Sequence, residues 1–186
     1  MMTTEKMKEL FKSGAQDELL MDIYLDENKL DYQRSRYVAA IEQFEKLYGA
    51  AEVSIYSAPG RSEIGGNHTD HNHGKVLAAA INLDAIAAVA KNGKDVIRLK
   101  SEGYDMDMVD ITDLEPKKSE YSKSKALIRG VCAGFVERGY EIGGFDAATA
   151  NDVVSGSGLS SSASFEVLVG TILNYLYNDG KVSPVE

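Results

Sequence analysis

The chain has 186 residues, of which 44% are hydrophobic and 26% are charged, so it is long and apolar enough to fold around one hydrophobic core. Its 29 acidic residues outnumber its 20 basic ones and give a net charge of -9, which argues against a general binder of nucleic acid or of anionic membranes. The single cysteine, Cys132, cannot form an internal disulfide, and no apolar run is long enough to cross a bilayer. Without a signal peptide in the first residues, these features predict a cytoplasmic protein.

Residues 3–48 have the apolar spacing of helices, in three successive segments. The apolar face of the third segment consists of Tyr37, Ile41, Phe44 and Tyr48. Gly49 is suited to end that helix, because glycine readily adopts the backbone conformations found after a last helical turn. We therefore expect a helical N-terminal extension over about residues 1–50.

The middle of the chain has the composition of strands. Val53–Tyr56 predicts a short strand, which the run Ala58-Pro-Gly60 is expected to end in a turn before Arg61. Residues 75–90 are rich in Val, Leu, Ile and Ala without a clear helical stripe, and we expect a buried strand here, with an Ala-rich helix as the alternative.

Shorter elements follow. Asn92-Gly93 predicts a hairpin turn into a strand at Val96–Leu99. The remaining expected elements are a strand over 106–111, a helix over 126–138 that ends at Gly139, and a strand over 144–154. Cys132 lies on the apolar side of that helix and is expected to be a buried side chain without chemistry. No repeat or linker divides the chain, so this order predicts one α+β domain, residues 1–186, with helices on a single mixed or antiparallel sheet.

The most informative stretch is the serine loop, Gly156-Ser-Gly-Leu-Ser-Ser-Ser162, followed by an amphipathic helix. The apolar face of this helix consists of Phe165, Leu168, Val169, Ile172, Leu173 and Leu176. Gly156 and Gly158 allow a ligand to approach the backbone closely, and Ser160, Ser161 and Ser162 place hydroxyl groups on the first helical turn. Together with the residues between them, Ser157 and Leu159, they predict an anion site at a helix N-terminus.

Two alternatives bear on this prediction. A Ser/Gly turn that only caps a helix would look similar, although the triple serine and the length of the helix weigh against it. The P-loop of many nucleotide-binding proteins is a different motif, because no Gly-Lys-Ser/Thr closes this loop.

The second unusual stretch, residues 61–74, holds all three histidines of the chain, together with Arg61, polar side chains and three glycines. A metal cluster of His68, His71 and His73 is one interpretation, but the spacing is a weak zinc signature without a cysteine. A solvated polar turn is another. The density of Arg, His, Asp and Asn favours a third, a site that hydrogen-bonds the hydroxyls of a sugar or polyol, with Arg61 placed to stabilise charge on a transferring phosphoryl group.

These two stretches resemble a known family. The run Ala58-Pro-Gly-Arg-Ser-Glu-Ile-Gly-Gly-Asn-His-Thr-Asp-His-Asn-His-Gly74 resembles the galactokinase signature, and Gly156-Ser-Gly-Leu-Ser-Ser-Ser-Ala163 resembles the nucleotide loop of the GHMP kinases, to which galactokinases belong. The resemblance extends from about Ser54 to the end of the chain. It implies the GHMP kinase N-terminal fold, an α+β arrangement related to the second domain of ribosomal protein S5.

The resemblance also implies roles for individual residues. Arg61 matches the arginine near the transferred phosphoryl group, and Ser162 matches the serine that binds Mg²⁺. Asn67, His68 and Asp70 match the positions that hold the sugar hydroxyls. The implied ligands are ATP, Mg²⁺ and galactose or a related hexose.

Three departures from the family pattern are visible. Asn67 stands where the signature has a sugar-binding glutamate, and Glu63 stands where it commonly has asparagine, so the identity of the sugar is left open between galactose and a related hexose. Val154-Ser155 replaces the usual proline before the nucleotide loop.

The resemblance covers only the N-terminal part of the family. The C-terminal domain, with the catalytic aspartate and the second Mg²⁺ ligand, is expected beyond Glu186, so these 186 residues alone are expected to be inactive and to self-associate through the face that this domain would cover. The leading hypothesis is the N-terminal domain of a galactokinase-like enzyme that phosphorylates the anomeric hydroxyl of galactose. The alternative is a non-catalytic, GHMP-like protein that senses a sugar or a nucleotide.

Overall fold

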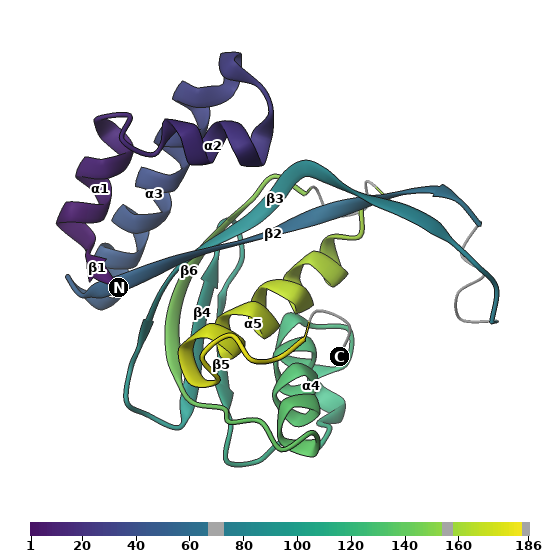
Figure 1. Cartoon of the computed structure of the whole chain (residues 1–186). Coiled ribbons are helices and arrows are strands. Elements are labelled where there is room, and N and C mark those ends of the chain that lie inside the picture. The colour runs from purple at the N-terminus through teal and green to yellow at the C-terminus, as the bar shows by residue number, and fades with distance from the viewer. Residues whose placement is uncertain (67–72, 154–157, 184–186) are drawn as a thin grey trace.

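A computed structural model describes residues 1–66, 73–153 and 158–183 (Figure 1). Within these residues the strands are β1 (Met2–Thr3), β2 (Glu52–Gly65), β3 (Leu77–Lys91), β4 (Val96–Ser101), β5 (Met106–Asp110) and β6 (Phe145–Asn151). The helices are α1 (Thr4–Lys12), α2 (Asp17–Tyr24), α3 (Leu30–Tyr48), α4 (Ser124–Glu137) and α5 (Ser161–Tyr177), with short 3₁₀ turns η1 (Glu27–Lys29) and η3 (Lys118–Glu120). None of these helices is both long and apolar enough to cross a membrane.

The described strands form one mixed sheet in the order β1-β2-β3-β6-β4-β5. Neighbours are antiparallel throughout, except that β4 and β6 run parallel. The expected α+β fold with a single sheet is therefore confirmed.

Helices cover both faces of the sheet, with α1 to α3 on one side and α4 and α5 on the other (Figure 1). Successive side chains of a strand point to opposite faces, so β3 contributes to both cores. Its residues Ile86, Ala88 and Ala90 lie in the core beneath α3, while Ala85, Ala87 and Val89 lie in the core beneath α5. The many alanines leave room for helices to pack closely on both sides.

The expected helical N-terminus is confirmed, with three α-helices between Thr4 and Tyr48. Gly49 ends α3 with φ +88°, and its amide donates to the carbonyl of Glu45 at 2.9 Å. The helix expected over 126–138 is α4, and its Cys132 is fully buried, as predicted. Burial raises the pKa of the Cys132 thiol to about 12, which makes it a poor nucleophile.

The turn expected at Ala58-Pro-Gly60 is wrong, because β2 continues through it to Gly65. The register with β3 shifts between Pro59 and Arg61, so the segment is a bulge rather than a turn. Within the described residues, β1 pairs with β2 only at Glu52 and Val53, so Pro59 lies where β2 is an edge strand, a position that tolerates proline.

The hairpin expected at Asn92-Gly93 is also wrong in part. The segment does turn, with Gly93 at φ +64° and the Asn92 side chain donating to Val96 O, but β6 lies between β3 and β4. A local turn signal predicts a change of direction, and it cannot predict that a later strand inserts between the two.

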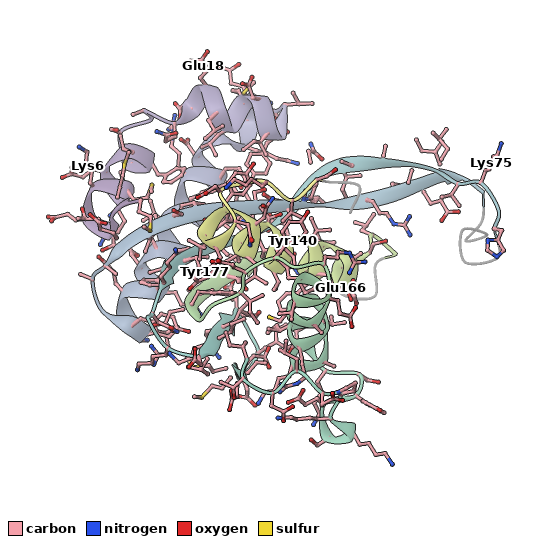
Figure 2. The ribbon with its side chains drawn as sticks, turned by 60° about the horizontal axis from the view of Figure 1, so that its bottom comes forward. Lys6, Glu18, Lys75, Tyr140, Glu166 and Tyr177 are labelled. Carbon is pink, nitrogen blue, oxygen red and sulfur yellow. The ribbon has the colours of Figure 1, made fainter. Side chains whose placement is uncertain are left out.

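Strands β2 and β3 extend beyond the body of the sheet as a two-stranded arm (Figure 1). The strand expected over 75–90 is buried only from Asp84 onward, while Leu77–Ala80 are exposed on the arm. In Figure 2, Lys75 marks the far end of the arm and Glu166 lies on α5 in the body. The arm carries the polar stretch that begins at Arg61.

Candidate functional site

Helix α5 carries the described end of the serine loop at its N-terminus. The predicted apolar face is confirmed, since Leu168, Val169, Ile172, Leu173 and Leu176 are buried and Phe165 packs against them. The hydroxyl of Ser164 also donates to the carbonyl of Ala58 at 2.9 Å, which fixes the first turn of α5 to β2. The start of the helix therefore has a defined position relative to the sheet.

Among the described residues, nothing caps or covers the N-terminus of α5. No side-chain cap bonds its first-turn amides within the described residues, and Ser162 is exposed. Gly158 has φ +78°, and a Cβ added there would meet no described atom within 4 Å. Free amides, the positive end of the helix dipole and open space are the features of an anion site.

Arg61 lies directly against this helix start. Its amide donates to Leu159 O at 3.2 Å, and its Nε donates to Ser160 Oγ at 3.0 Å, across 99 positions of sequence. Gly60 makes the approach feasible, because a Cβ there would lie 3.0 Å from Leu159 O and 3.1 Å from the methyl groups of Val153. The two stretches singled out in the sequence thus meet at Arg61 and the start of α5.

Glu63 lies on the same side of β2 as Arg61. Arg61 pairs with Ala80 and Glu63 pairs with Ala78, without a register shift between them. Because side chains alternate along a strand, residues two apart share a face. The acid that replaces the usual asparagine is therefore near the candidate phosphoryl site.

The other predicted site residues are Asn67, His68, Asp70, Gly156 and Ser157, which lie outside the described residues. Two members of the alternative histidine cluster, His68 and His71, lie outside them too. No group of three or more potential metal-ligating side chains occurs in the part of the chain that the structure describes.

A buried polar cluster next to this site was not predicted from the sequence. Arg36 of α3 pairs with Asp84 of β3 at 2.6 Å, and the two side chains are 5% and 3% exposed. Asp84 also accepts hydrogen bonds from Tyr24 and Ser57. The sequence contained a signal for this cluster, because Asp84 is the one acid in the largely apolar strand β3. Arg36 lies on the helical face that carries the buried residues of α3.

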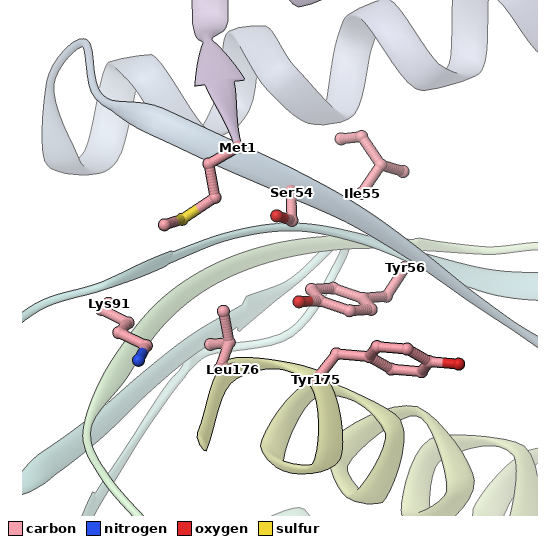
Figure 3. A pocket seen from close by; sticks show the side chains of 7 residues that line it. All are labelled: Met1, Ser54, Ile55, Tyr56, Lys91, Tyr175 and Leu176. Atoms are coloured by element: carbon pink, nitrogen blue, oxygen red, sulfur yellow. The ribbon is translucent and has the colours of Figure 1, made fainter. Parts of the chain in front are cut away.

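A shallow cavity of about 540 Å³ lies at the other end of α5 (Figure 3). It is lined by Met1, Ser54, Ile55, Tyr56, Lys91, Tyr175 and Leu176. Tyr175 and Leu176 belong to the last turn of α5, whereas the serine loop precedes its first turn. This cavity is therefore not part of the candidate site.

Two family models match the stretches that contain the candidate site. Residues 42–91 match the galactokinase galactose-binding signature, and residues 126–186 match the N-terminal domain of GHMP kinases. The first match includes Arg61 and Glu63, and the second includes the serine loop and α5.

Individual relatives agree. The chain is 32% identical over 150 residues to a galactokinase of Clostridium tetani, covering 78% of this chain and 37% of that protein. It is 39% identical over 138 residues to a galactokinase of Streptomyces coelicolor, covering 73% of this chain and 35% of that protein. The chain thus spans little more than a third of the length of these relatives.

Solved structures show the same fold. A galactokinase of Lactococcus lactis, crystallised with galactose, matches with a TM-score of 0.70 and 30% identity, over 77% of this chain and 38% of that one. A mevalonate kinase of Methanococcus jannaschii matches with a TM-score of 0.56 and 15% identity, over 69% of this chain and 41% of that one, and at this identity the likeness concerns the fold alone. On these matches the chain belongs to the GHMP kinase family and corresponds to the N-terminal part of a galactokinase.

Proposed function

We propose that this chain supplies the nucleotide- and sugar-binding part of a galactokinase, an enzyme that transfers the γ-phosphoryl group of MgATP to the anomeric hydroxyl of galactose. The observation that carries the proposal is the contact of Arg61 with Leu159 and Ser160, because it joins the sugar-signature stretch to the nucleotide-loop stretch. In this proposal residues 1–186 form the N-terminal domain, with residues 1–50 as a helical extension.

The phosphates of ATP would bind at the start of α5. Amides of the first turn, the open space beside Gly158 and the hydroxyls of Ser160 and Ser161 suit phosphate oxygens. Gly156, Ser157 and Leu159 complete this loop in the proposal. The acidic chain as a whole does not attract phosphate, so a local set of donors has to hold it.

Ser162 fits the role of a Mg²⁺ ligand, because its hydroxyl is exposed on the first turn, where phosphate oxygens would also be available. Mg²⁺ prefers oxygen ligands and keeps several waters, so one hydroxyl together with phosphates is a suitable set. When bound, the ion supplies charge neutralisation on the phosphates.

The sugar would bind to the polar stretch that follows β2. Asn67, His68 and Asp70 are proposed to hold its hydroxyls, and the Lactococcus lactis relative is described in complex with galactose. An amide, an imidazole and a carboxylate supply both donors and acceptors, as a polyol requires.

Arg61 would stabilise the charge that develops on the transferring phosphoryl group. A guanidinium carries a positive charge and directs several donors in one plane. Phosphoryl transfer depends mainly on positioning and on neutralising charge, so a cation held against the nucleotide loop has the required effect.

The test is ADP formation by the intact protein with MgATP and a panel of hexoses. We expect turnover of galactose or a related hexose, and Arg61→Ala should lower kcat by about 10²-fold or more with a smaller change in the sugar KM. Arg138→Ala, at an exposed position after α4, is the matched control and should leave both parameters unchanged.

Two results would count against the proposal. Equal and mild effects of Arg61→Ala on kcat and KM would contradict the role proposed for Arg61. Saturable binding of one hexose without turnover of any would instead indicate a sensor.

A further inference from the structure

Helix α3 contacts Asp152, the residue at which the chain leaves β6 toward the serine loop. The Tyr32 hydroxyl donates to Asp152 Oδ1 at 2.7 Å, and Arg36 Nη1 lies 3.4 Å from Asp152 Oδ2. Tyr32 and Arg36 are four residues apart and so lie on one face of the helix. Asp152 is the first residue after β6. Through Tyr32 and Arg36, the N-terminal extension contacts both of its carboxylate oxygens.

Arg36 is itself fixed in place. Its Nη1 donates to Asp84 Oδ1 at 2.6 Å, and its Nη2 donates to Asp84 O at 2.7 Å and to Ala150 O at 3.2 Å. The side chains of Arg36 and Asp84 are almost fully buried, so water does not compete for these bonds. Arg36 therefore joins α3 to the adjacent ends of β3 and β6.

The contacts continue from Asp152 toward the candidate site. The amide of Asp152 donates to Asp84 O at 2.9 Å, and the amide of Val153 donates to Asn151 Oδ1 at 2.8 Å. Val153 is buried, and its methyl groups lie against Gly60. The next residue on β2, Arg61, makes the contacts with Leu159 and Ser160 described above.

We infer that Tyr32 and Arg36 are positioning residues for nucleotide binding, which act by holding Asp152 and thereby the start of the chain that leads into the serine loop. Among the described residues, neither makes a hydrogen bond or ion pair with Arg61 or with the start of α5, and neither lies in the stretches that match the family models, residues 42–91 and 126–186. The inference rests on the proposed function, because it assumes that the serine loop binds a nucleotide. On this inference, the helical extension helps to position the proposed phosphoryl transfer site.

Tyr32→Phe is the cleanest test, because Tyr32 is 54% exposed and the change removes only the hydroxyl. In the intact protein we expect the dissociation constant for MgATP to rise about fivefold, as for loss of one hydrogen bond, while galactose affinity stays the same. Amide hydrogen exchange at Asp152 and Val153, measured without nucleotide, should become faster. Tyr104→Phe, another exposed tyrosine, is the matched control and should change none of these values.

A double-mutant cycle shows whether Tyr32 acts through Asp152. Asp152→Ala should weaken MgATP binding at least as much as Tyr32→Phe, and adding Tyr32→Phe to Asp152→Ala should then have no further effect. Additive effects, or unchanged exchange and unchanged MgATP affinity in Tyr32→Phe, would overturn the inference. If the unsubstituted protein binds no nucleotide, the proposed function fails and the inference fails with it. If the unsubstituted protein binds MgATP and Tyr32→Phe binds it equally well, only the inference is overturned and the proposed function stands.

Discussion

Arg61 is a charged residue that is held in place through both its backbone and its side chain. Its amide bonds to Leu159 O and its guanidinium to Ser160 Oγ, so both ends of the residue are tied to the start of α5. A lysine would keep the charge but could not offer the planar set of donors. Two positions farther along the same face stands Glu63, an acid where galactokinases commonly have an amide.

The exchanged acid and amide lead to a prediction about the sugar. The double variant Glu63→Asn with Asn67→Glu restores the usual galactokinase arrangement, and we expect it to raise kcat/KM for galactose relative to other hexoses. A site that bonds a hydroxyl discriminates strongly against an analogue that leaves its buried polar groups unpaired. The measurement is kcat/KM for each hexose of a panel, with Glu63→Asn alone as the control. An unchanged ranking of the hexoses would mean that these two positions do not select the sugar.

At the scale of elements, α5 and α4 pack on the same face of the sheet but hold different loops. Helix α5 presents the described part of the serine loop at its first turn. Helix α4 fixes the chain between β5 and its own start, since Arg129 donates two hydrogen bonds of 2.8 Å to Glu120 and further bonds to the carbonyls of Asp110 and Asp113.

Gly158 provides a test of the serine loop. Gly158→Val should weaken MgATP binding by at least about tenfold, because the new side chain would occupy the space beside the amides that bind phosphate. Gly103→Val is a matched control, since Gly103 also has φ +78° and no described atom within 4 Å of an added Cβ. Both variants should lose a similar amount of thermal stability through backbone strain, and only the first should lose affinity in calorimetry. If the two variants bind MgATP with equal affinity, the serine loop only caps the helix and does not bind the nucleotide.

The Arg129–Glu120 pair predicts a pH dependence of stability. The hydrogen bonds from Arg129 lower the pKa of Glu120 below its usual value, so the pair stabilises the fold above about pH 5 and loses this effect as the pH falls through the lowered pKa. Melting temperatures of the unsubstituted protein and of Glu120→Gln should therefore differ at neutral pH and converge in acid. A difference that stays constant from about pH 7 to about pH 3 would contradict an effect of charge.

For the whole molecule, a thin alanine-rich sheet between two helical layers determines how the parts fit together. Ala88 of β3 pairs with Ala148 of β6, and both are fully buried beneath α3. Small side chains here let α3 approach the sheet closely enough for Arg36 to reach Asp84. Stability and the positioning of Asp152 therefore depend on the same packing.

Enlarging one of these alanines should separate the layers. Ala88→Leu should lower the free energy of unfolding by about 1–3 kcal/mol, the usual cost of overpacking a core, as measured by urea denaturation. Ala78→Leu, on the exposed arm of the same strand, is the control and should be nearly neutral. Equal effects of the two substitutions would mean that α3 is not closely packed on the sheet.

The sequence by itself determined the helices at the N-terminus, α4, α5 and the identity of most strands, because each depends on apolar periodicity within a short window. It also determined the two chemical stretches, since Gly158, the serines after it and Arg61 are recognisable by residue type and order. Family resemblance added their expected roles. All of these roles, those of Arg61 and the serine loop as well as those of Asn67, His68 and Asp70, stay predictions.

Tertiary structure alone decided how these parts meet. The continuation of β2 through Pro59-Gly60 depends on its pairing with β3, and the position of β6 between β3 and β4 depends on a strand that comes some fifty residues later in the chain. The contact of Arg61 with Ser160 spans 99 positions, and that of Tyr32 with Asp152 spans 120. Contacts of this range follow from sheet pairing and from packing of two helical layers, which no local pattern of residues contains.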